Sequence, residues 1–250
     1  MKIKCLACEA LTRLVYLCAA RSPHIVDVTL FQLGLHNQPA DLRNRLQAEI
    51  DSASGQGYGA VVLAYALCGR ATEGLTARDI PVILPRAHDC ITLFLGSRAL
   101  YNQEHDSIPG TYWYALDFIE RGNQSGVNIV LGSEDLIQPV YEEYVQKYGK
   151  DNADYLMEVM GAWKNNYQRA VYIEMGVGDG RAVEERAREE AARRNWSFER
   201  YMGDLRLIHK LLCGEWDEDV LVVQPGQRIA MSMDEGVICA EEKIEGYLRP

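Results

Sequence analysis

Residues 59–90 read "GAVVLAYALCGRATEGLTARDIPVILPRAHDC" and contain two continuous apolar runs, each bounded by glycine or proline. Short β-branched runs of this kind are typical of strands that are buried on both faces of a parallel sheet. The segments 59–69 and 80–90 therefore predict two buried strands. Strand and helix patterns alternate before them, with strands at 2–8 and 26–34 and helices at 9–21 and 39–53. This order predicts a parallel sheet covered by helices.

The C-terminal part of the chain shows the same order of elements. Apolar runs predict strands at 169–176, 196–203 and 218–226, and helical patterns separate them at 179–195 and 204–214. We therefore expect an α/β fold of two Rossmann-like parallel-sheet halves, each with the order β-α-β-α-β, joined by a helical, aromatic-rich connection.

Three domains follow from this interpretation: an N-terminal half that carries a Cys/His site (1–110), a mainly helical connection or cap (111–169) and a C-terminal half (170–250). The role of the aromatic segment from Tyr141 to Tyr167 is open, because it suits both a helical pair packed on the sheet and a cap over a site.

Composition and charge exclude some classes of protein. The 250 residues carry a formal net charge of -10, and the 26 Lys and Arg residues are scattered, which argues against a nucleic-acid partner. No apolar run of 18 residues is present, so we expect no membrane partner and a cytoplasmic protein. Seven cysteines form no framework of close spacings, which is typical of reduced thiols.

Four candidate metal ligands follow the ends of predicted strands. Cys8 lies at the end of the first strand, Cys68 at the end of the third, and His88 and Cys90 just past the apolar run of the fourth. Parallel strands bind ligands beyond their carboxyl ends, and neighbouring strands lie only about 5 Å apart. Three thiolates and an imidazole suit zinc, while three thiolates with an open position suit a [4Fe-4S] cluster. We therefore expect a metal site at Cys8, Cys68, His88 and Cys90.

Other polar residues near the same edge are candidates for further roles. His88 and Glu9 are candidate catalytic residues, and Arg70 and Arg86 are candidates for binding a cofactor or an anionic substrate group. Arg70 suits an ordinary loop residue equally well. The remaining thiols are expected to be inert core or helix residues, namely Cys5, Cys18, Cys213 and Cys239.

Several segments also carry a family resemblance: "LAYALCG" (63–69), "PRAHDCITLFLGS" (85–97), "EEYVQKYGKDNADYL" (142–156) and "VVQPG" (222–226). They resemble DUF1638, an uncharacterised family of bacteria and methanogenic archaea. The resemblance implies that Cys68, His88 and Cys90 belong to signature motifs, and Cys8 matches more loosely. It also implies a setting near corrinoid-dependent methyl-transfer systems, with a corrinoid protein as partner.

Three functions remain open from the sequence. The first is a metal-dependent enzyme of zinc-thiolate type in one-carbon or methyl-transfer metabolism, acting on a small molecule in the crevice between the halves. The second is an iron–sulfur enzyme, a lyase or reductase, with an open coordination site. The third is a non-catalytic protein that binds or delivers a metal or corrinoid. A homodimer is expected on general grounds alone.

Overall fold

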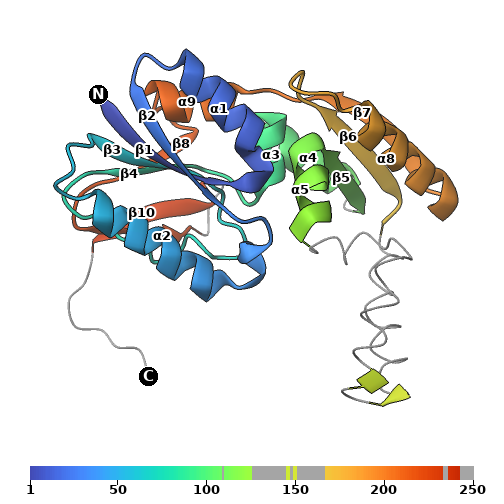
Figure 1. The fold of residues 1–250 in the computed structure, drawn as a ribbon, viewed down its shortest axis with the longest axis horizontal. Helices are drawn as coiled ribbons and strands as arrows, with labels where there is room; N and C mark the ends of the chain where they lie inside the picture. Colours follow the sequence, from blue (N-terminus) through green and yellow to red (C-terminus); the bar gives the residue numbers. More distant parts are fainter. Residues whose placement is uncertain (109, 126–144, 147–148, 151–166, 233–235, 243–250) are drawn as a thin grey trace. The chain divides into compact units, whose positions relative to one another are not determined.

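The computed structural model describes residues 1–108, 110–125, 145–146, 149–150, 167–232 and 236–242, which form a mixed α/β protein (Figure 1). The chain forms two compact units. Unit 1 comprises Met1–Tyr101, Met175–Val177 and Met202–Pro250, and unit 2 comprises Asn102–Glu174 and Gly178–Tyr201. Each unit is drawn from interleaved parts of the chain. The sequence pattern predicts three consecutive domains instead, at 1–110, 111–169 and 170–250.

Unit 1 contains a five-stranded sheet in the order β2-β1-β3-β4-β8. The strands are β1 (Lys2–Cys8), β2 (Ile25–Phe31), β3 (Ala60–Ala64), β4 (Val82–Pro85) and β8 (Val220–Val223). The pairings β1–β2, β1–β3 and β3–β4 are parallel, and every residue of β3 and β4 is buried. The expected parallel sheet with central buried strands is thus confirmed.

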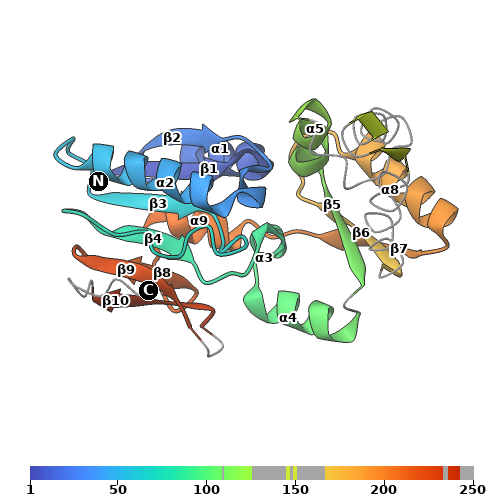
Figure 2. The same ribbon diagram turned by 90° about the horizontal axis from the view of Figure 1, so that it is seen from below.

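Helices cover both faces of this sheet, with α1 (Thr12–Arg21) and α9 (Arg206–Cys213) on one face and α2 (Pro39–Ala53) on the other (Figure 1). A short 3-10 helix, η1 (Glu9–Leu11), precedes α1, and another, η2 (Leu35–Asn37), precedes α2. Helix α2 begins with a proline and buries Leu42, Leu46 and Ile50 at four-residue spacing. Helix α3 (Cys90–Leu95) follows β4. The hairpin of β9 (Gln227–Met231) and β10 (Ile238–Glu242) contacts β8 (Figure 2).

Unit 2 contains a three-stranded sheet in the order β5-β6-β7. Its strands are β5 (Thr111–Ala115), β6 (Arg169–Glu174) and β7 (Ser197–Met202), and β5 pairs in parallel with β6. Helix α4 (Arg98–Ser107) precedes β5, α5 (Leu116–Ser125) follows it, and α8 (Arg181–Arg194) connects β6 to β7. Its core is rich in aromatic residues, including Tyr112, Tyr114 and Tyr172.

The second Rossmann-like half does not form a sheet of its own in the described residues. Strands β6 and β7 pair with β5, which lies in the range expected to be mainly helical, and β8 pairs antiparallel with β4 of unit 1. A four-residue apolar strand such as Val220–Val223 can extend any sheet with a free edge, because its sequence specifies burial and not its partner. The helices expected between Tyr141 and Tyr167 lie largely outside the described residues.

No helix in the described part of the chain is both long and apolar enough to cross a membrane.

Candidate thiol site

Three thiols of unit 1 follow the carboxyl ends of its central strands. Cys8 is the last residue of β1, Cys68 lies four residues beyond β3, and Cys90 is the first residue of α3, five residues beyond β4. Two backbone hydrogen bonds join the segments after β3 and β4: Leu67 N–H donates to Ala87 O at 2.9 Å, and Cys68 N–H donates to His88 O at 3.0 Å. The loops therefore leave the sheet edge side by side.

The three thiols lie near enough to oppose one another's ionisation. Desolvation raises the pKa of Cys68 to about 12, and the neighbouring Cys8 adds to the rise. The pKa of Cys90 is raised well above its ordinary value, first by desolvation, then by Asp89, Cys68 and Cys8. Both residues are partly exposed, but their sulfurs are poorly solvated. Burial therefore favours the neutral thiol over the thiolate at both Cys68 and Cys90.

Tyr65 is a polar residue of this site that the sequence analysis did not single out. It is 3% exposed, and its hydroxyl meets no nitrogen or oxygen partner among the described residues. Desolvation raises the pKa of Tyr65, and the charges of Cys8 and Cys68 and a hydrogen bond with the Cys8 side chain raise it further. A phenol inside the apolar segment "LAYAL" gives no sequence signal, because tyrosines are common in cores. The fold places its hydroxyl among the thiols.

The loop that carries Cys68 has an unusual backbone. Cys68, Gly69 and Arg70 have φ angles of 47°, 64° and 71°, so three successive residues are left-handed and two of them are not glycine. Such conformations cost free energy and persist where the surrounding structure fixes them, often at functional sites. The hydrogen bond from Cys68 N–H to His88 O is one contact that fixes this loop.

Asp89 positions Cys90 at the start of α3. Its backbone is extended, and its carboxylate accepts a hydrogen bond from Ile91 N–H at 2.9 Å, as an N-cap residue does. The Tyr101 hydroxyl donates to the other carboxylate oxygen at 2.6 Å. Asp89 therefore holds the helix start and Tyr101, and makes no described contact with His88 that would orient the imidazole.

Replacement of Asp89 by alanine is expected to lower the free energy of unfolding by about 1–2 kcal/mol, because it removes an N-cap and the partner of the Tyr101 hydroxyl. Denaturant unfolding measures this loss. Asp41→Ala is the matched control, since Asp41 lies in the first turn of α2 and pairs with the exposed Arg45. Equal losses in the two variants would contradict the capping role of Asp89.

The two candidate catalytic residues differ in their surroundings. Glu9 follows Cys8 directly, its side chain accepts a hydrogen bond from Leu33 N–H at 3.1 Å, and its charge contributes to the raised pKa of Tyr65. His88 is exposed, and its ring lies 6.5 Å from the Tyr101 ring between centroids. The structure thus brings Glu9 to the thiols, whereas the His88 ring lies at the surface beside Tyr101.

The two arginines expected to bind an anionic group have other partners. Arg70 is exposed and makes two hydrogen bonds to the Glu73 carboxylate, at 2.6 and 3.1 Å. The Arg86 side chain donates to the carbonyls of Ile238 and Gly236, beside β10. Arg86 therefore ties the hairpin to the end of β4.

The four thiols expected to be inert have their contacts elsewhere in unit 1. Cys5 is fully buried in β1, where desolvation raises its pKa to about 12. Desolvation raises the pKa of Cys18 to about 11, with a smaller contribution from Cys213. Cys239 contacts the carbonyl of Met231 in the β9–β10 hairpin. Among the described residues, no disulfide joins any of the seven cysteines.

Among the described residues, no three His, Cys, Asp or Glu side chains are arranged as ready ligands of one metal ion. The donor types of the site still suit a soft metal, because three thiols and an imidazole follow neighbouring strand ends. Metal binding would require deprotonation of the thiols and movement of the Cys68 loop or of His88.

Comparison with known proteins identifies the family of the chain. The model of the family described as "Protein of unknown function (DUF1638)" matches residues 30–212, a range that includes Cys68, His88 and Cys90 but not Cys8. No curated protein and no solved structure matches the chain. Because the family model covers more than half of its residues, the chain belongs to the DUF1638 family.

Proposed function

We propose that this protein binds a zinc ion through Cys8, Cys68 and Cys90, with His88 as the fourth ligand, and acts on a small molecule as an enzyme of one-carbon or methyl-transfer metabolism. The observation that carries the proposal is that three thiols from three separate segments follow the ends of the neighbouring strands β1, β3 and β4, and that Cys8 acts on the pKa of both Cys68 and Cys90. A metal ion bound there would convert the thiols to thiolates and neutralise their charge.

When bound, zinc would supply Lewis acidity, holding a substrate thiol as its thiolate at neutral pH. The chain itself provides the surroundings. Asp89 and Tyr101 fix the start of α3 and hence the backbone of Cys90, and the Tyr65 hydroxyl is placed to donate a hydrogen bond to a sulfur. Hydrogen bonds to a ligating sulfur tune how strongly it donates to the metal.

The methyl-transfer setting rests on the family resemblance and on the chemistry of zinc thiolate sites. Glu9 is the candidate catalytic carboxylate that lies near the thiols, because its charge contributes to the raised pKa of Tyr65. Its carboxylate accepts a hydrogen bond from Leu33 N–H, and we assign it the exchange of a proton with a bound substrate.

The test is anaerobic purification followed by metal analysis, and then titration of the metal-free protein with zinc. We expect one zinc per chain and release of about three protons per zinc at pH 7, since each thiol binds as a thiolate. Proton release is measured with a pH indicator and needs no knowledge of the substrate. Failure to hold or take up any metal would contradict the proposal. Zinc uptake without turnover of thiol or methyl donors would favour the delivery function instead.

An iron–sulfur cluster is the second candidate, and one observation favours it. Cys8 acts on the pKa of Cys68 and of Cys90, whereas the His88 ring is exposed and lies beside Tyr101. Three cysteines are the ligand set of a cluster with one open iron. A brown protein with iron and sulfide after anaerobic purification would support this candidate over zinc.

A further inference from the structure

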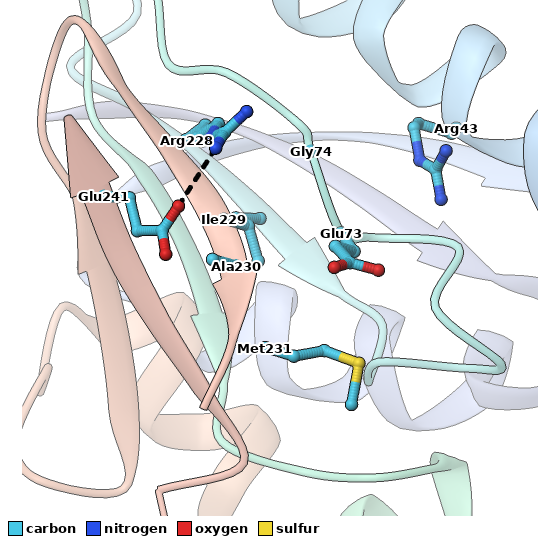
Figure 3. A pocket seen from close by; sticks show the side chains of 8 residues that line it. All are labelled: Arg43, Glu73, Gly74, Arg228, Ile229, Ala230, Met231 and Glu241. Atoms are coloured by element: carbon cyan, nitrogen blue, oxygen red, sulfur yellow. Dashed lines mark hydrogen bonds and ion pairs between the residues drawn. The ribbon is translucent and has the colours of Figure 1, made fainter. Parts of the chain in front are cut away.

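Unit 1 contains a pocket of about 400 Å³, lined in part by the loop that follows Cys68 (Figure 3). It lies between α2, the loop that follows Arg70 and the β9–β10 hairpin. Its lining consists of two arginines, two glutamates and four other residues: Arg43, Arg228, Glu73, Glu241, Gly74, Ile229, Ala230 and Met231. The lining is strongly polar, which suits a charged ligand and not an apolar one.

Both glutamates of the pocket are already paired with arginines. Glu73 makes two hydrogen bonds with Arg70, which is not part of the lining, at 2.6 and 3.1 Å. Glu241 pairs with Arg228 at 3.1 Å, on the opposite side of the pocket from Arg43 (Figure 3). Their negative charges are therefore neutralised locally, and the charge that remains in the lining is the guanidinium of Arg43.

Arg43 has no carboxylate partner within ion-pair distance among the described residues. Its Nη2 donates to the carbonyl of Arg70 at 2.6 Å, which fixes the guanidinium in place. Its Nε is buried and has no hydrogen-bond acceptor in the described structure. A buried N–H without an acceptor is unfavourable, so the hydrogen bonds of the Arg43 side chain are incomplete in this arrangement, and Arg43 lines the pocket.

The backbone beside Arg43 leaves room for a ligand. Gly74 has a φ angle of +85°, and a methyl group placed on it would lie 3.9 Å from Arg43 Cδ and 4.0 Å from Nε. Gly74 N–H donates to Ile229 O at 2.7 Å, which ties this loop to β9. The loop thus passes close to the Arg43 side chain at a position that has no side chain of its own.

We propose that this pocket binds the oxyanion group of a small molecule, a carboxylate or a phosphate, through Arg43. A fixed guanidinium with a buried, unused N–H is suited to charge-assisted hydrogen bonds with such a group. The proposal stands apart from the thiol site, because none of the lining residues is a proposed metal ligand. A protein with a net charge of -10 repels anions in general, so saturable anion binding here requires a built site.

Isothermal titration of the full chain with sodium phosphate and, separately, with sodium malonate tests the proposal, with sodium chloride at equal ionic strength as reference. We expect one of the two anions to bind with 1:1 stoichiometry, and the anion that binds identifies the group. Arg43→Gln is expected to weaken this binding at least about tenfold. Arg45→Gln is the matched control, because Arg45 lies on the same helix and pairs with the exposed Asp41.

Equal affinities in the wild type and in Arg43→Gln, or binding of neither anion by the wild type, would overturn the proposal. Because Arg43→Gln could misfold, a second experiment uses the wild-type protein alone and measures chemical modification of its arginines. Phenylglyoxal modifies accessible arginines, and the binding anion is expected to slow modification of Arg43, identified by peptide mass, but not that of Arg45. No protection of Arg43 at saturating anion would also overturn it.

Discussion

Replacement of Cys68 by serine is expected to weaken zinc binding by at least about 100-fold. Zinc sites of four ligands bind with about 10–16 kcal/mol at neutral pH, so loss of one thiolate removes about 3 kcal/mol. A serine hydroxyl does not ionise at neutral pH and is a poor ligand for a soft metal. Competition with a chromophoric chelator measures the affinities of the two proteins, and the number of protons released per zinc should fall by about one.

Cys213→Ser is the control for this variant. Cys213 is also a partly exposed thiol of unit 1, but it lies at the end of α9, where it interacts with Ser22 and Cys18. We expect its zinc affinity to equal that of the wild type. If Cys68→Ser binds zinc as tightly as Cys213→Ser does, Cys68 is not a ligand and the proposed function loses its main support.

The Arg169→Met variant is expected to lose about 3–5 kcal/mol of stability, because it leaves a buried carboxylate without its cation. Arg169 is 3% exposed at the start of β6 and pairs with Glu104 at 2.8 Å. It also donates to the Thr111 hydroxyl at 2.9 Å and reaches Glu199 at 3.4 Å. One guanidinium thus links α4, β5, β6 and β7 of unit 2.

Denaturant unfolding measures the loss, and a second substitution tests its cause. If the cost arises from the isolated charge of Glu104, then Arg169→Met combined with Glu104→Met should recover most of the lost stability. Arg200→Met is the control for an exposed pair, because Arg200 on β7 is about half exposed and pairs with Glu174. Its cost should stay within about 1 kcal/mol. A double variant as unstable as Arg169→Met would contradict this explanation.

Local sequence patterns predict much of unit 1 correctly. The apolar runs of β3 and β4 and the four-residue spacing of Leu42, Leu46 and Ile50 have one low-energy solution each, a buried strand and an amphipathic helix. Strand order then places Cys8, Cys68 and Cys90 at one sheet edge, because parallel strands all end on the same side. The mutual effects on their pKa values agree with that placement.

Strand β5, "TYWYA", shows where local patterns fail. Its aromatic residues favour a strand, but the helical segments around it led to the expectation of a helical connection. Strand β8 failed differently, since its existence was expected and its partner was not. The first error concerns the type of element, and the second concerns pairing between distant segments, which local propensity does not encode.

The sequence by itself therefore determined the strands and helices of the parallel core of unit 1 and the sheet edge that Cys8, Cys68 and Cys90 follow. Tertiary structure alone decided that β8 joins β4, that the Tyr65 hydroxyl lies among the thiols, and that Arg43 keeps an unused N–H in a polar pocket. The physical reason is that periodicity reports how each segment is buried, whereas partners and unsatisfied polar groups depend on which distant segments fill the remaining space.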